Sequence, residues 1–315
     1  MNKEMYYDFE KRIWMLKEKA KKLVKKLPVL NSLYSRSDNL LSRTEELFHE
    51  QIQMQEEIEN LKRQLAKMQN RMDYEIDALD QVILGRNRVS IPEGKIAVYT
   101  AIIDKYDVLW EPDYIDERCD YYCFTNNKEI VSDKWNIVFF DRNQYPELEE
   151  CDSVKVARYI KTHPHVLLKN YKQTLWVDAN LQIKKSIVNW IGLFLNDAAM
   201  LTFKHPLRDC IYEEGEACKE KKKDACDVID RQLSIYRNNK YPEHNGLIMT
   251  NVLYRKNNKT ITDFNEKWWM EIKNGSRRDQ LSFNYVAWKT GILFDQCHLN
   301  PSQNYFFAYY AHEKR

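Results

Sequence analysis

The pattern of apolar and polar positions divides the chain into a helical N-terminal third and a longer region in which strands and helices alternate. Within residues 1–30, Ile13, Leu16, Ala20, Leu23 and Leu27 recur at helical spacing among many lysines and arginines. This spacing predicts a basic amphipathic helix. Such a helix can lie in an anionic membrane surface, or it can pack on its own domain.

The next segment carries a heptad pattern and contains neither Gly nor Pro between Asp38 and Ile83. The apolar residues seven positions apart are Leu40, Leu47, Met54, Leu61 and Met68, and those that follow one of them by four are Ile58, Leu65 and Met72. Two helices that share this repeat bury the apolar seam against each other. The pattern therefore predicts a coiled coil over residues 38–85 and a homo-oligomer. The alternative is one long helix that folds back against the second domain.

A Gly- and Pro-containing linker then leads into a second domain, which we expect over residues 93–315. Apolar runs predict strands at 95–103, 121–125, 135–140, 174–177, 199–203 and 246–253. Helical patterns cover 153–163, 186–195, 224–239, 260–272 and 279–290. This alternation predicts an α/β fold with a mixed, Rossmann-like sheet flanked by helices, in which ligands bind at the carboxyl ends of the strands.

Composition narrows the possible partners. The net charge is +2 and 30% of the residues are charged, so the chain lacks the strongly basic balance of nucleic-acid-binding proteins. The sequence offers no secretory signal and no stretch of about 18–20 apolar residues. Seven cysteines, an odd number, fit reduced thiols better than a disulfide framework. We therefore expect a cytoplasmic protein, with peripheral contact at the inner face of the membrane if the basic helix binds lipid.

One predicted strand delivers two oxygen-bearing side chains to its carboxyl end. In the run Trp176-Val-Asp-Ala-Asn180, strand alternation puts Asp178 and Asn180 on one side of the backbone. Oxygen ligands with open positions suit Mg²⁺ or Mn²⁺ held against a diphosphate. The same short pattern also forms turns that bind no metal.

Several ordered motifs together resemble the TOD/MUCI glycosyltransferase-like family over residues 94–298. These motifs are Val154 to His165, Trp176 to Asn180, Phe203 to Arg208 with Tyr212 to Glu214, and Arg278 to Phe283. The resemblance implies a GT-A-like fold that binds a nucleotide sugar, here a UDP-linked one. Fold by itself does not settle chemistry.

The resemblance also implies roles for individual residues. Lys155 and Arg158, one helical turn apart, would face the diphosphate, where a guanidinium suits phosphate. Asn126 stands where relatives are expected to have Asp. The residues that would cradle the nucleoside are Thr100, Ala101, Asp104, Thr125 and Asn126.

The remaining assignments concern the metal and the reacting sugar. Asp178 and Asn180 would bind Mn²⁺ or Mg²⁺, and His298 would complete the metal site. His205 resembles an element that faces acceptor or sugar, although a lone His is often structural. Asp279 and Gln280 would face the donor sugar, and Asp279 could instead serve only as a helix cap. An inverting enzyme would need a base, for which Asp279 is a candidate.

Together these features favour a metal-dependent glycosyltransferase that moves a sugar from a nucleotide-sugar donor to a glycan or lipid-linked acceptor. The family resemblance suggests bacterial surface polysaccharide synthesis as the setting. Two alternatives stay open at this point. One is a non-enzymatic assembly protein that binds glycan or nucleotide sugar and is organised by the coiled coil. The other is a hydrolase acting on a lipid-linked substrate, although no Ser-His-Asp or HExxH motif supports it.

Overall fold

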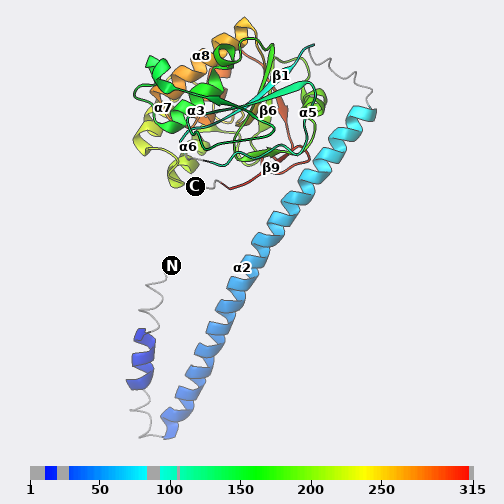
Figure 1. The fold of residues 1–315 in the computed structure, drawn as a ribbon. Helices are drawn as coiled ribbons and strands as arrows, with labels where there is room; N and C mark the ends of the chain where they lie inside the picture. Colours follow the sequence, from blue (N-terminus) through cyan, green and yellow to red (C-terminus); the bar gives the residue numbers. More distant parts are fainter. Residues whose placement is uncertain (1–10, 20–27, 84–92, 105–106, 312–315) are drawn as a thin grey trace. The chain divides into compact units, whose positions relative to one another are not determined.

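The computed structural model describes residues 11–19, 28–83, 93–104 and 107–311. Internal contacts divide the chain into two compact units, Met1–Gln69 and Asn70–Arg315 (Figure 1). The predicted linker before residue 93 falls mostly outside the described residues. The start of the second domain at residue 93 therefore stays a prediction, and its first strand begins at Ile96.

The N-terminal part is helical. Residues 11–19 form a helix, whereas the rest of the helix predicted over residues 1–30 lies outside the described residues, apart from the start of helix α2. Helix α2 runs without interruption from Pro28 to Ile83, with the proline at its first position, where its missing N–H costs nothing. The described helices include none that is long and apolar enough to cross a membrane.

The described part of the heptad seam on α2 is open to solvent in the single chain. Leu47, Leu61 and Met68 are 56%, 55% and 63% exposed. A lone helix with an exposed apolar stripe lacks the tertiary packing that usually stabilises helices. The long helix is thus confirmed, while its pairing into a coiled coil stays a prediction.

A mostly parallel seven-stranded sheet organises the second unit, in the order β3-β2-β1-β4-β7-β6-β8. Strand β7 runs antiparallel to both neighbours, β4 and β6, while the other pairs are parallel. The carboxyl ends of β1, β4, β6 and β8 therefore meet at one edge. The strands are β1 Ile96–Ile102, β2 Cys119–Thr125, β3 Asn136–Phe139, β4 Gln173–Val177, β6 Met200–Lys204, β7 Ile248–Lys256 and β8 Asp295–Cys297.

Helices cover both faces of this sheet. Helices α3, α6, α7 and α8 lie on one side and α5 on the other (Figure 1). The helices are α3 Ser153–Thr162, α4 Pro164–Leu167, α5 Ile187–Phe194, α6 Ile211–Glu220, α7 Cys226–Asn238, α8 Lys259–Asn274 and α9 Gln280–Thr290, with 3₁₀ turns at Arg142–Gln144 and Pro146–Leu148.

The buried strand β1 supplies both layers of the core. Tyr99 packs with Trp176 and the α3, α8 and α9 side chains, whereas Val98 belongs to the opposite cluster around Trp190 of α5. Alternation along the strand sends successive side chains to opposite faces. A strand buried on both faces has a continuous apolar run in its sequence, and for this reason β1 could be predicted from the sequence.

A second, two-stranded sheet fastens the C-terminal segment beside β4. Strand β5 (Leu181–Ile183) pairs antiparallel with β9 (Phe307–Tyr309), and Tyr310 N donates to the carbonyl of Asn180 at 2.9 Å. Phe306 and Phe307 are buried. These two phenylalanines therefore pack into the core of the domain.

The predicted fold class is confirmed as a mixed α/β architecture, with differences in detail. Helix α6 and the three-residue strands β5, β8 and β9 were not predicted. Such short strands depend on pairing with distant segments rather than on their own periodicity. Strands β5 and β9 form the separate two-stranded sheet that follows the turn of Asp178 and Asn180.

Candidate functional site

Asp178 follows β4 directly and is held by the neighbouring strand. Its backbone N–H donates to the carbonyl of Asn251 on β7 at 2.8 Å, and its own carbonyl accepts from Leu181 N at 2.9 Å. These bonds form a tight turn between β4 and β5. Asn180, in the same turn, is buried. The two predicted oxygen ligands are thus fixed at the carboxyl edge of the sheet.

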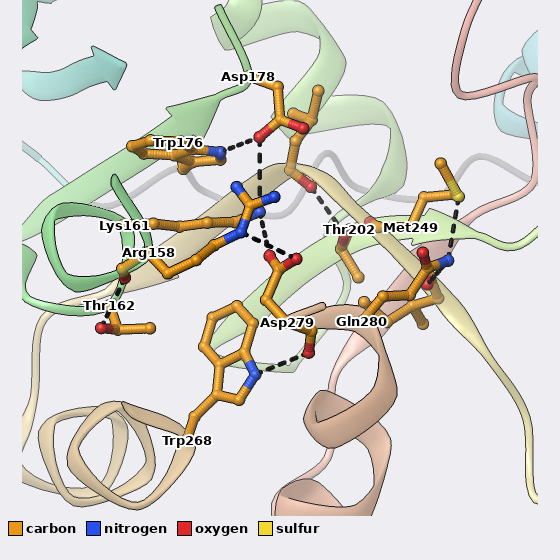
Figure 2. A network of polar contacts seen from close by, with 12 residues as sticks. Arg158, Lys161, Thr162, Trp176, Asp178, Thr202, Met249, Trp268, Asp279 and Gln280 are labelled. Atoms are coloured by element: carbon orange, nitrogen blue, oxygen red, sulfur yellow. Dashed lines mark hydrogen bonds and ion pairs between the residues drawn. The ribbon is translucent and has the colours of Figure 1, made fainter. Parts of the chain in front are cut away.

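One oxygen of the Asp178 carboxylate is already engaged. Trp176 Nε1 donates to Oδ1 at 2.6 Å, and Lys161 Nζ lies 3.5 Å from the same oxygen (Figure 2). Among the described residues none donates a hydrogen bond to Oδ2, and the side chain is 27% exposed. Asp178 therefore keeps one oxygen for a ligand.

A buried ion-pair cluster lies beneath this carboxylate. Lys161 Nζ donates to Asp279 Oδ2 at 2.6 Å, and Arg158 Nε lies 3.2 Å from Asp279 Oδ1 (Figure 2). The side chains of Lys161 and Asp279 are 0% and 2% exposed. Lys161 Nζ also lies 5.4 Å from the ring centroid of Trp176. Charges removed from water this completely persist only when they are paired.

The charge state of Asp279 follows from these neighbours. Burial alone would raise the pKa of its carboxyl, but the positive charges of Arg158 and Lys161 and the hydrogen bond from Lys161 outweigh burial and hold the pKa well below the usual range. Asp279 is therefore ionised at neutral pH. A carboxyl of such low pKa is a weak general base, because the best catalytic pKa lies near the working pH.

An open cleft of about 240 Å³ lies above the cluster. Arg158, Asp178 and Asn180 line it together with Ala101 and Trp176. The side chains that add further positive charge to its wall are Lys223, Arg277 and Arg278. Four cationic residues against the two acids Asp107 and Asp178 give the cleft a net positive lining. Such a lining attracts phosphate and favours its binding.

The residues predicted to cradle the nucleoside are brought to the same edge, but only one of the five lines the cleft. Ala101 lines it, and its neighbour Thr100 is buried. Asp104 and Asn126 bond each other, with Asn126 donating to Asp104 Oδ1 at 2.9 Å and accepting from Asp104 N at 2.7 Å. Thr125 Oγ1 accepts from Asn127 N. The Asp104–Asn126 pair joins the ends of β1 and β2.

Lys155 was expected to face the cleft beside Arg158, but its side chain points elsewhere. Its Nζ donates to the carbonyl of Lys273 at 2.8 Å, which fastens α3 to the end of α8. The second cation of the site is instead Lys161, one turn beyond Arg158 on the same helix. It lies within the predicted motif, and its i, i+3 spacing from Arg158 was the available signal.

His205 and Gln280 were predicted to be catalytic, but their side chains make structural contacts. His205 Nδ1 accepts from the backbone N–H groups of Leu207 and Arg208, so the ring closes the turn after β6. Gln280 Nε2 donates to the carbonyl of Ile248 at 2.9 Å. Neither residue lines the cleft. Asp279 stands at the N-cap position of α9, but its side chain makes no capping hydrogen bond and is held instead by Arg158 and Lys161.

His298 is exposed just after β8 and does not line the cleft. Two strands separate β8 from β4, so their backbones lie roughly 14 Å apart at the usual strand spacing. Its role as a metal ligand stays a prediction that this arrangement does not support. Asp178 Oδ2 and the Asn180 amide suit a hard divalent cation better, since both offer oxygen and both line the cleft.

Comparison with known proteins identifies the family. The model of the TOD1/MUCI70 glycosyltransferase-like domain matches residues 67–302, and no curated protein matches. Among solved structures, the apo form of mouse xyloside xylosyltransferase 1 is similar at 12% identity and a TM-score of 0.39, over 65% of this chain and 84% of that one. The apo structure of the bifunctional glycosyltransferase WbbM is similar at 8% identity and a TM-score of 0.38, over 63% of this chain and 38% of that one. With three quarters of its length matched by the family model, the chain belongs to the TOD1/MUCI70 glycosyltransferase-like family.

Proposed function

We propose that this protein is a metal-dependent glycosyltransferase that takes a sugar from a UDP-linked donor and passes it to a glycan or lipid-linked acceptor. Family membership supports glycosyl transfer. The observation that carries the donor site is the cleft at the end of β4, where Asp178 and Asn180 face a wall of positive charge. A GT-A-like arrangement of the sheet and a role in surface polysaccharide synthesis belong to the same proposal.

The chain's own residues divide the work between them. Departure of a nucleoside diphosphate leaves negative charge on the phosphate, and Arg158, Arg277 and Arg278 line the space in which that charge would form. Asp178 and Asn180 would hold Mn²⁺ or Mg²⁺, which neutralises phosphate oxygens and acts as a Lewis acid. Asp279, ionised and enclosed by cations, positions Arg158 and Lys161 rather than accepting a proton.

Calorimetric binding of UDP to the full chain, with and without Mn²⁺, tests the donor site. We expect manganese-dependent binding in the wild type and its loss in Asp178→Ala. Asp133→Ala is a matched control, because Asp133 is exposed and lies outside the cleft. Binding that is indifferent to metal and to Asp178 would contradict the proposed site.

Turnover of UDP-sugars then tests the reaction. Release of UDP that depends on an added glycan acceptor supports a transferase. Metal-dependent binding without turnover of any donor would instead favour a protein that binds nucleotide sugar and assembles other components. The turnover experiment therefore tests the transfer reaction separately from nucleotide-sugar binding at the cleft.

The N-terminal unit extends the proposal to partners. The exposed seam of α2 supports self-association of the chain through a coiled coil. In the helix over residues 11–19, Trp14 and Leu16 are 64% and 67% exposed beside Lys11, Arg12 and Lys17. This combination supports peripheral contact with anionic lipid from the cytoplasmic side. Sedimentation with anionic but not neutral vesicles is the expected result.

A further inference from the structure

Two histidines at the junction of α3 and α4 meet a carboxylate of α8. His163 follows the last residue of α3, His165 lies in α4 and Glu266 lies in α8. One ligand atom from each side chain lies within 4.8 Å of the other two. Glu266 Oε1 is 2.8 Å from His165 Nε2 and 3.6 Å from His163 Nε2. The cluster therefore joins two helices that are distant in the sequence.

The tautomer of His163 follows from its other contact. Its Nδ1 lies 2.8 Å from the carbonyl oxygen of Tyr159, which can only accept, so Nδ1 carries the proton. Its Nε2 lies 3.6 Å from Glu266 Oε1, which is too far for a hydrogen bond, so no proton bridges the two atoms. Its Nε2 lone pair therefore faces a carboxylate oxygen. Two acceptors opposite each other at this distance are satisfied by a cation between them.

The second ring is arranged differently. Asn265 Nδ2 lies 3.5 Å from His165 Nδ1, and Asn265 Oδ1 accepts from Arg255, which fixes the amide orientation. His165 therefore donates its Nε2 proton to Glu266 when no ion is present. Metal binding at Nε2 would move that proton to Nδ1, because a neutral imidazole carries one N–H and a metal-bound nitrogen cannot keep it, and the 3.5 Å contact from Asn265 would be given up. Glu266 is 51% exposed, so it can adjust and solvent can reach the ion.

We propose that His163, His165 and Glu266 bind one Zn²⁺ ion, separate from the metal of the cleft. Two imidazole nitrogens and one carboxylate oxygen are ligands that Zn²⁺ prefers, with water in the fourth position. The hydrogen bond from His163 Nδ1 to a backbone carbonyl is the outer contact that metal-bound histidines usually make. The proposal does not depend on glycosyl transfer.

The ion would fasten the end of α3 to α8. His163 lies two residues after Lys161, whose carbonyl already accepts from Tyr99 and Arg255 at 2.6 Å each. Zinc would add a third attachment at the same turn. Occupancy of the site would therefore stabilise the turn that carries Lys161 beneath the cleft.

Titration of the metal-stripped full chain with Co²⁺ tests the site, because Co²⁺ in a tetrahedral site absorbs strongly in the visible range. We expect the strong visible band to correspond to one tetrahedral Co²⁺ per chain and to disappear when Zn²⁺ displaces it, whereas Co²⁺ held by oxygen ligands in the cleft would absorb only weakly. His165→Ala should abolish the band, and Glu266→Gln should weaken binding at least about tenfold. These two positions are less buried than His163, so their variants should fold. Zn²⁺ should raise the melting temperature of the wild type but not of either variant.

Two controls make the result specific. His244→Ala removes the histidine of a second cluster, formed with Asp209 and Glu213, whose three residues are all exposed. Asp178→Ala removes the main ligand proposed for the cleft. Both variants should keep the Co²⁺ band. If the wild type gives no tetrahedral spectrum, or if His165→Ala and Glu266→Gln keep it, the three side chains form only a hydrogen-bonded group and the proposal fails.

Discussion

Lys161 and Asp279 lie 118 positions apart in the chain and form a buried ion pair of 2.6 Å. Lys161 comes from the last turn of α3, and Asp279 directly precedes α9. Asp279 also contacts Arg158 and, through its carbonyl, accepts from Trp268 Nε1 at 3.0 Å. The pair thus joins the two helices below the cleft and leaves the Asp178 carboxylate between Lys161 and solvent.

Removing the lysine should destabilise the fold. Lys161→Met keeps much of the side-chain volume but leaves Asp279 with Arg158 as its remaining cation. Loss of one partner of a buried pair typically costs about 3–5 kcal/mol. We expect a decrease of about 3 kcal/mol in the free energy of unfolding, measured by urea denaturation. Lys95→Met is the control, because the Lys95–Asp120 pair is exposed and its loss should change stability little. Equal effects of the two substitutions would contradict the role of burial.

Stability should depend on pH through Asp279. Its folded pKa lies below the unfolded value of about 3.9, so the unfolded chain binds the proton more readily. The stabilisation is therefore complete above about pH 5 and is lost as the pH falls below about 4 towards the folded pKa. Urea unfolding of wild type and Asp279→Asn between pH 7 and 3 measures this. The variant should lose less stability on acidification, and Asp133→Asn should follow the wild type.

The positive wall of the cleft should control affinity for a diphosphate. Arg277 lines the cleft, and Arg277→Ala should weaken UDP binding about tenfold, because a charge-assisted contact with phosphate is lost. The difference between wild type and variant should shrink as salt is added. Arg231→Ala removes an exposed arginine outside the cleft and should bind UDP like the wild type. The same affinity in all three proteins would place the nucleotide elsewhere.

The apolar seam of α2 should determine the oligomeric state. Leu61→Glu puts a charge in the middle of the seam and should give a monomer in sedimentation at micromolar concentration, where the wild type forms a larger species. Gln53→Glu adds the same charge beside the seam and should leave the oligomer intact. A monomeric wild type would show that the seam does not mediate self-association.

The elements predicted from sequence are those whose patterns are local. The β1 and β4 runs are buried on both faces, and the α3, α5 and α8 periodicities were located to within a few residues. The Trp176 to Asn180 run likewise predicted Asp178 and Asn180 at a strand end. These features follow from residues that are neighbours in the chain.

The unpredicted features depend on contacts between distant segments. Lysine is rarely fully buried, so the i, i+3 spacing of Lys161 from Arg158 did not by itself indicate an inward side chain, and its partner Asp279 is far along the chain. The sequence did not distinguish Lys155 from a cleft-facing cation, because its hydrogen-bond acceptor, the carbonyl of Lys273, belongs to another helix. In the same way β5 becomes a strand only because β9 pairs with it.

That pairing has a consequence for synthesis on the ribosome. Gln182 of β5 accepts a hydrogen bond from the hydroxyl of Tyr310, 128 residues later. Domains generally fold as units once their chain has emerged, and here the turn that holds Asn180 lacks its hydrogen bond from Tyr310 N until that segment has emerged. A nascent chain that stalls before that segment would expose an unpaired β5 edge next to the cleft. Translation and completion of the site are therefore coupled.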